Sequence, residues 1–84
     1  MAVEIDLHGL FLEDAIDEIV DDVEELSILG TKEVILIHGF SHGQVIKQWI
    51  WSRLLDAELE KLGIHVIKKT VVPQNDGATI LQIK

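Results

Sequence analysis

The chain has 84 residues, 48% of them hydrophobic, and a formal net charge of −8 at pH 7. This length accommodates one hydrophobic core, so we expect a single domain over residues 1–84, and the absence of cysteine excludes disulfides and thiolate metal sites. The acidic balance argues against a large non-specific nucleic-acid footprint, and the lack of a membrane-length apolar run or a signal pattern predicts a cytoplasmic protein with no membrane partner.

The first half of the chain alternates between strand and helix patterns. Residues 3–7 form a short strand candidate that contains β-branched side chains. Residues 12–28 carry apolar side chains at three- and four-residue steps with acids between them, which predicts an amphipathic helix that Gly30 is suited to end. Residues 33–38 are a largely apolar run, typical of a strand that is covered on at least one face.

The second half opens with a pattern for one long helix over residues 43–62. Its first apolar stripe consists of Ile46, Trp49, Ile50, Leu54 and Ala57. A second stripe lies on a different side and consists of Trp51, Leu55, Leu59 and Leu62. Because one sheet cannot easily cover both stripes, the second either packs under connecting loops or forms a homodimer or protein-partner surface.

Two further strands complete the predicted fold. Residues 64–72 predict a third strand that Pro73 ends, residues 74–77 have the composition of a turn, and residues 78–84 alternate as a fourth strand. The element order is therefore βαβαββ, with a parallel right-handed crossover first and an antiparallel hairpin last. We expect an α/β fold, a two-layer sandwich of two helices on a four-stranded mixed sheet.

A His-Gly dipeptide follows each of the two strands predicted in the first half, at His8-Gly9 and His38-Gly39. If those strands are parallel neighbours, both imidazoles lie at the carboxyl-terminal edge of the sheet, where open α/β sheets bind ligands. Asp6 precedes His8 by two residues on a strand, so the two side chains point to the same face. The pattern therefore predicts a polar functional edge.

The segment between Gly39 and Gly43 leads into the second predicted helix. The first amide groups of a helix lack intrahelical partners and carry the positive end of its dipole, so this start is a candidate anion site. Ser41 is the better candidate for the helix cap, and His42 adds a third imidazole. Such a set of donors suits a phosphate or a phosphodiester.

Each of these polar residues has more than one interpretation. Asp6 is a candidate general base, a group that fixes the tautomer of His8, or a simple acceptor for loop amides. Asp6 with His8 is also a candidate pair of ligands for Mg²⁺ or Mn²⁺, although the spacing matches no closed metal-site signature. His38 is either part of the chemistry or a strand-end residue satisfied by a carbonyl, and His42 is either a ligand or loop surface.

The ordered motifs resemble those of the small MutS-related (Smr) domain family. Residues 5–10 (IDLHGL) resemble its Asp-Leu-His-Gly opening, residues 37–39 (IHG) its second motif, and residues 77–79 (GAT) its ending, while Lys47 is similar to a lysine on its second helix. The resemblance covers essentially the whole chain. It implies a βαβαββ fold like the C-terminal domain of translation initiation factor three, and nucleic-acid binding with cleavage of DNA or RNA in several members.

The first hypothesis is therefore an Smr-like module that binds DNA or RNA and nicks it at the His8/His38 edge, with assistance from Mg²⁺ or Mn²⁺. The resemblance makes Asp6, His8 and His38 the catalytic candidates. The candidates for binding the nucleic acid or its phosphates are Gly9, Gly39, Phe40, Ser41, His42, Gly43 and Lys47.

The alternative hypothesis is a non-catalytic protein-interaction or dimerisation module. The second motif of the family usually continues with Lys or Arg and then Gly, where this chain has Phe40 and Ser41, and Phe40 either stacks on a base or merely packs. Phe11 also stands where the family often has a helix-capping threonine. On this interpretation the second stripe of the long helix is the interface. A metabolite-binding or acid–base enzyme at the same edge is a third interpretation.

Overall fold

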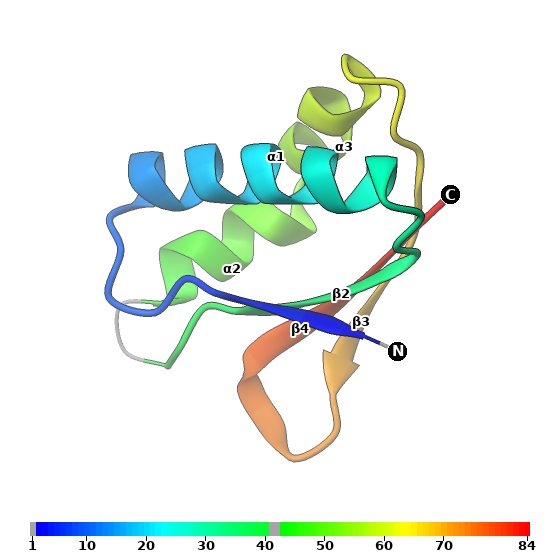
Figure 1. Ribbon diagram of the computed structural model, residues 1–84. Helices are drawn as coiled ribbons and strands as arrows, with labels where there is room; N and C mark the ends of the chain where they lie inside the picture. The colour runs from blue at the N-terminus through cyan, green and yellow to red at the C-terminus, as the bar shows by residue number, and fades with distance from the viewer. Residues whose placement is uncertain (1, 41–42) are drawn as a thin grey trace.

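The computed structural model describes residues 2–40 and 43–84. Along the chain its elements are β1 (Val3–Asp6), α1 (Leu12–Ile28), β2 (Glu33–Ile37), α2 (Gly43–Trp51), α3 (Arg53–Glu60), β3 (Val66–Val72) and β4 (Asn75–Ile83). The strands form one sheet in the order β1-β2-β4-β3, in which β1 and β2 are parallel and the other pairs antiparallel. The helices cover one face of the sheet and leave the other open (Figure 1). The predicted α/β sandwich with a mixed sheet is confirmed.

Alternation along β1 and β2 determines which side chains face the helices. Ile5 on β1 and Val34 and Leu36 on β2 are buried, because successive residues of a strand point to opposite faces. Asp6 pairs with Ile37 in the parallel register, so the two strands end together at one edge of the sheet. This edge is where the chain leaves both strands through a His-Gly dipeptide.

The core lies between the sheet and the helices. Helix α1 contributes a stripe at four-residue spacing, Ala15, Ile19 and Val23, and its acidic side chains lie between these positions. The other buried apolar residues of the core cluster are Ile5, Leu7, Val34, Leu36, Ile46, Trp49, Ile50, Leu55, Leu59, Ile64, Leu81 and Ile83. None of the helices in the described ranges is long and apolar enough to cross a membrane.

The predicted long helix is in fact two helices, α2 and α3, with a break at Ser52. The backbone of Ser52 is extended (φ −84°, ψ 168°), and its hydroxyl oxygen accepts a hydrogen bond from the amide of Leu54 at 3.2 Å. The same hydroxyl donates to the carbonyl of Trp49 at 2.6 Å. Serine competes with helical hydrogen bonding in this way, which explains why it ends α2 and caps α3.

A partly buried ion pair links this break to the sheet. The ammonium group of Lys69 on β3 lies 2.5 Å from Oδ1 of Asp56 in the first turn of α3, and the Lys69 side chain is 12% exposed. Lys69 also donates to the carbonyl of Ser52 at 3.0 Å. One lysine therefore contacts both the carboxylate and the carbonyl at the break, and these contacts link the start of α3 to β3.

The break bears on the two interpretations of the second stripe, packing within the protein or forming a partner surface. Leu55 and Leu59 have no exposed surface, because the change of direction at Ser52 turns them into the core. Trp51 and Leu62 remain about two-fifths exposed. The four residues therefore do not form a continuous apolar surface for a homodimer or a protein partner.

The final hairpin also differs from the prediction. The turn consists of Pro73 and Gln74, since Val72 pairs with Asn75 and Gln74 has a φ of +63°. Proline fixes φ near −65° at the first central position, and a positive φ at the second is the pattern of a type II turn. The predicted turn residues from position 75 onward, including Gly77, therefore belong to β4.

The position of Leu55 can be tested by its effect on stability. Replacing Leu55 by Ala should lower the free energy of unfolding by about 2–5 kcal/mol, because it leaves a cavity in the core. The matched variant Leu54→Ala, at a neighbouring leucine that is 61% exposed, should change it by less than about 0.5 kcal/mol. Urea denaturation measures both values. Equal effects of the two variants would contradict the placement of the stripe in the core.

Candidate functional site

The first His-Gly dipeptide forms a tight turn at the end of β1. The amide of Leu7 still donates to the carbonyl of Ile37 at 2.7 Å, and the amide of Leu10 then donates back to the carbonyl of Leu7 at 3.1 Å. Gly9 has a φ of +82°, a conformation that residues with a Cβ rarely adopt. The turn places His8 at the surface, at its first central position.

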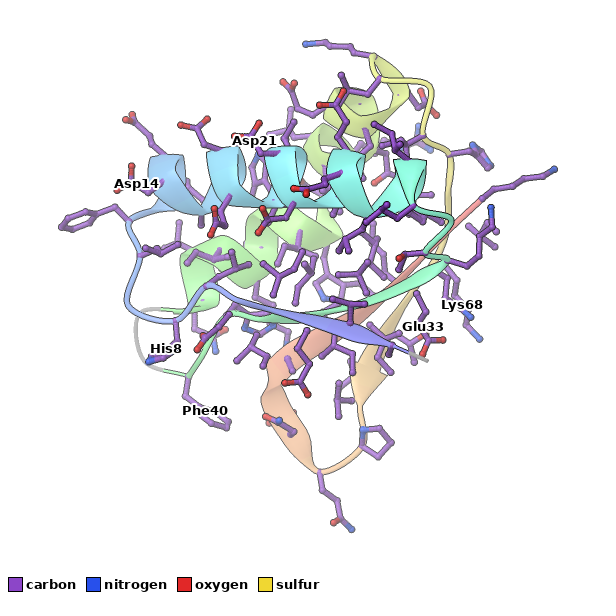
Figure 2. The ribbon with its side chains drawn as sticks, viewed as in Figure 1. His8, Asp14, Asp21, Glu33, Phe40 and Lys68 are labelled. Carbon is purple, nitrogen blue, oxygen red and sulfur yellow. The ribbon has the colours of Figure 1, made fainter. Side chains whose placement is uncertain are left out.

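The second His-Gly dipeptide is fixed by β4. The amides of His38 and Gly39 both donate to the carbonyl of Gly77, each at 2.9 Å. Gly39 has a φ of +83°, and a Cβ added there would lie 3.3 Å from Cβ of His8. The two corners are therefore neighbours, as the parallel strand order predicted. Figure 2 shows His8 and Phe40 at the same end of the sheet, with Glu33 and Lys68 at the other end.

Asp6 and His8 form an exposed hydrogen-bonded pair. Nδ1 of His8 lies 2.5 Å from Oδ1 of Asp6, and the side chains are 69% and 57% exposed. The same oxygen accepts the backbone amide of His8 at 3.1 Å. These bonds from His8 stabilise the carboxylate, the imidazole bond most, and hold the pKa of Asp6 below its ordinary value. Because Nδ1 donates to a carboxylate, Nε2 of His8 is left as the outward-facing nitrogen.

The ring of His38, by contrast, points into the protein and is 1% exposed. Its Nδ1 lies 3.1 Å from the carbonyl oxygen of Gly39, and its Nε2 lies 3.1 Å from the hydroxyl oxygen of Thr79. A carbonyl oxygen only accepts, so the neutral ring carries its proton on Nδ1. The hydroxyl of Thr79 accepts a hydrogen bond from the indole of Trp51 at 3.1 Å, which leaves its own proton for Nε2 of His38.

The environment of His38 favours the neutral ring. Burial lowers its pKa most, the hydrogen bond to Gly39 opposes this, and the positive charge of Lys47 lowers the pKa further. His8 and His38 therefore have different chemistry in the same motif. Among the described residues Nε2 of the exposed imidazole has no hydrogen-bond partner, whereas the buried imidazole supports the turn and the wall of the site.

A cleft of about 440 Å³ lies beside this edge and is lined by His8, Gly9, Ile37, His38, Gly39, Phe40 and Gly43. Gly43 begins α2 against the backbone of His38, where an added Cβ would overlap with the His38 carbonyl oxygen. Glycine at this position therefore allows the start of the helix to approach the second corner. Three glycines in the lining leave the main chain accessible to a ligand.

The other predicted site residues lie after β2 and along α2. The Phe40 side chain is 64% exposed, and Lys47 lies one helical turn after Gly43 on α2. Ser41 and His42 fall outside the described residues. Thr79 and Trp51 join the network around His38 from β4 and the end of α2, although neither was among the residues predicted for this edge. The GAT motif at residues 77–79 was the one signal for Thr79, and nothing in the sequence indicated the indole contact.

Few metal-ligating side chains gather among the described residues of this edge. In the described ranges, 2–40 and 43–84, no group of three or more His, Asp or Glu side chains is placed to hold a metal ion. Asp6 already uses Oδ1 for His8. A divalent cation here would take Asp6 as its carboxylate ligand, with phosphate and water oxygens as further ligands.

Comparison with solved structures identifies a similar fold over nearly the whole chain. The Smr domain of Thermus thermophilus MutS2 superposes with a TM-score of 0.67 at 22% sequence identity, covering 98% of each chain. No family model and no curated protein matches the sequence. The fold is thus that of an Smr domain, in agreement with the motifs in the sequence.

The Asp6–His8 bond can be tested by carboxyl titration. Replacing His8 by Ala removes the imidazole bond, so the pKa of Asp6 should rise toward its ordinary value of 3.8. Carbon-13 NMR of the Asp6 carboxyl group over pH 2–6 measures the change. His65→Ala is the matched control, because His65 is exposed and faces Glu60 at 4.0 Å. A pKa of Asp6 unchanged by His8→Ala would show that the pair does not persist in solution.

The tautomer and pKa of His38 can be tested by nitrogen-15 NMR. At pH 7 we expect a proton on Nδ1, and titration below the ordinary value of 6.5 because of burial. As the pH falls through 6.5 the unfolded chain takes up a proton that the folded chain resists, so His38 should lower the free energy of unfolding at pH 5.5 relative to pH 7.5. Titration of His38 at or above 6.5 would contradict the buried, neutral assignment.

Proposed function

We propose that the chain binds nucleic acid in the cleft beside His8 and cleaves a phosphodiester bond there. The observation that carries the proposal is the exposed Asp6–His8 pair at the rim of a glycine-lined cleft. The Smr fold and the order of the motifs support nucleic acid as the ligand. The start of α2 at Gly43 adds helix-terminal amides to the same wall, and such amides favour phosphate.

In the proposed reaction, Nε2 of His8 takes the proton of the attacking hydroxyl group, which is water or, on RNA, the ribose 2′-hydroxyl. The hydroxyl oxygen forms a bond to phosphorus as the bond to the leaving oxygen breaks, and the leaving oxygen receives a proton from the imidazolium or from water. Asp6 stabilises the imidazolium charge through Nδ1. His38 has no free nitrogen facing the cleft and acts by holding the second corner in place.

In the proposed reaction His8 carries the proton transfers, and the described residues supply no group of three or more metal-ligating side chains. The expected role of Mg²⁺ or Mn²⁺ is limited to phosphate neutralisation with Asp6 as the protein ligand. Cleavage assays with either ion and with EDTA separate the two cases. Loss of cleavage in EDTA would assign the ion an essential part, and persistence would show that the imidazole pair is sufficient.

The assignment of the pair is tested by substitution. Asp6→Ala and His8→Ala should each reduce cleavage of labelled RNA or DNA by about 10²- to 10⁴-fold, the usual contribution of a positioned general base. Both side chains are exposed, so circular dichroism and thermal unfolding should remain close to those of the wild type. His65→Ala, which alters an exposed histidine beside a glutamate, should cleave normally.

Two outcomes would change the proposal. Unchanged cleavage by both Asp6→Ala and His8→Ala would remove these residues from the reaction. Binding without cleavage by the wild-type chain, across single strands, branched DNA and structured RNA, would leave a non-catalytic binding module.

A further inference from the structure

Both phenylalanines of the chain lie on the surface, and each follows one of the two His-Gly corners. Phe11, just before α1, is 83% exposed, and Phe40, after β2, is 64% exposed. Aromatic side chains carry a large apolar surface that folding normally buries. Two such rings left in water at one functional edge indicate that a ligand contacts them.

The two rings line adjoining hollows. The 440 Å³ cleft beside His8, here called the histidine cleft, is lined in part by Phe40. A second hollow of about 370 Å³, here called the apolar groove, is lined by Gly9, Leu10, Phe11, Leu12, Val45 and Ile46. Gly9 belongs to both linings, so the two hollows meet there. His8 adjoins Gly9 in the chain and lies at this junction. His8 therefore lines one hollow together with Phe40, and its chain neighbour Gly9 lines the other together with Phe11.

The ring of Phe40 is held in place rather than loosely solvated. A Cβ added to Gly77 would lie 3.1 Å from Cε2 and 3.2 Å from Cζ of Phe40, so the ring rests against the backbone of β4. The carbonyl of Gly77 fixes the loop that carries the ring by accepting the amides of His38 and Gly39. Such a pre-ordered ring with open surface is suited to stack on a flat ligand at low entropic cost.

The charges of the edge disfavour binding through phosphates alone. The chain has a net charge of −8, and none of the described residues that line the two hollows is Lys or Arg. Lys47 on α2 is the cation that acts on His38. Affinity for a polyanion at this edge therefore requires a contribution that does not depend on charge, and stacking of bases on aromatic rings is such a contribution.

We propose that Phe11 and Phe40 stack on unpaired bases on the two sides of the phosphate at His8, so that the ligand is a single-stranded segment. This inference rests on the proposed function. Bases inside a duplex hide their faces in the helical stack and cannot reach the rings, whereas unpaired bases expose them.

The test compares ligands that differ in their bases at constant charge. Fluorescence anisotropy measures binding of labelled ten-nucleotide strands to the His8→Ala variant, which keeps the strands intact. The strands are oligothymidylate DNA, oligouridylate RNA, an all-abasic DNA strand and a DNA duplex of equal length. We expect either single strand to bind at least about tenfold more tightly than the abasic strand and the duplex, and the DNA and RNA arms show which sugar is preferred.

Substitutions in the same background then assign the effect to the rings. Phe11→Ala and Phe40→Ala should each weaken binding of the single strand by about 5- to 150-fold and leave binding of the abasic strand unchanged. Phe40→Leu, which keeps an apolar contact to Gly77 without an aromatic face, should behave like Phe40→Ala. The control Ile67→Ala alters a side chain of β3 that is 60% exposed, and it should bind as the parent does.

The salt dependence gives an independent measurement. If stacking dominates, the logarithm of the association constant should fall with the logarithm of salt concentration with a slope of about −1. Binding through many phosphates would instead give a slope of about −4 or steeper. The steep slope would overturn the stacking proposal.

Different results would overturn base stacking and the proposed nuclease function. Equal binding of normal and abasic strands, with His8-dependent cleavage retained in Phe11→Ala and Phe40→Ala, would overturn stacking and leave the nuclease assignment intact. Absence of binding to all four ligands by both the wild type and His8→Ala would overturn the proposed function, and the stacking proposal with it.

Discussion

The parallel pairing of β1 with β2 is the constraint on which the site depends. The register sets Asp6 opposite Ile37, so both strands end together and their His-Gly corners come into contact. A slip of one residue in β1 would turn Asp6 toward the core and bring Leu7 to the surface. Burial of Ile5 and Leu7 opposes that slip, because it would expose both of them to water. Hydrophobic burial on one face of the sheet thus holds the polar pair on the other.

The same register explains why two identical dipeptides have opposite environments. Along β2 the inward positions are Val34 and Leu36, and His38 continues this alternation into the interior. Along β1 the inward positions are Ile5 and Leu7, so His8 continues the outward alternation that begins with the exposed side chains of the strand. One imidazole is consequently desolvated and neutral beside Thr79, and the other is exposed beside Asp6. Whether each histidine is buried or exposed therefore depends on its place in the inward–outward alternation of its strand, and not on the His-Gly motif itself.

Prediction from the sequence succeeded where the pattern within one segment is enough to determine its structure. Helix α1 begins and ends at the predicted residues, since its apolar spacing and acidic remainder specify one buried stripe. The prediction of a single helix over residues 43–62 was wrong, because the apolar spacing there fits one helix or two. Ser52 has only a modest preference against the helix interior, and the break depends on Lys69 from a strand that comes later in the chain. The prediction of the hairpin turn was wrong for a similar reason, because Gln74 adopts the positive φ that the composition had assigned to Gly77.

For the site, the sequence by itself determined which groups are present and that two of them share a strand. Asp6 and His8 are local neighbours, so their pairing follows from alternation and a tight turn. Only the tertiary structure decided that His38 is buried, that Thr79 and Trp51 satisfy it, and that Gly77 supports Phe40. These contacts join residues separated by 28 to 41 positions or by whole strands. Packing of the sheet against α2 brings them together, and no periodicity within a single segment encodes that packing.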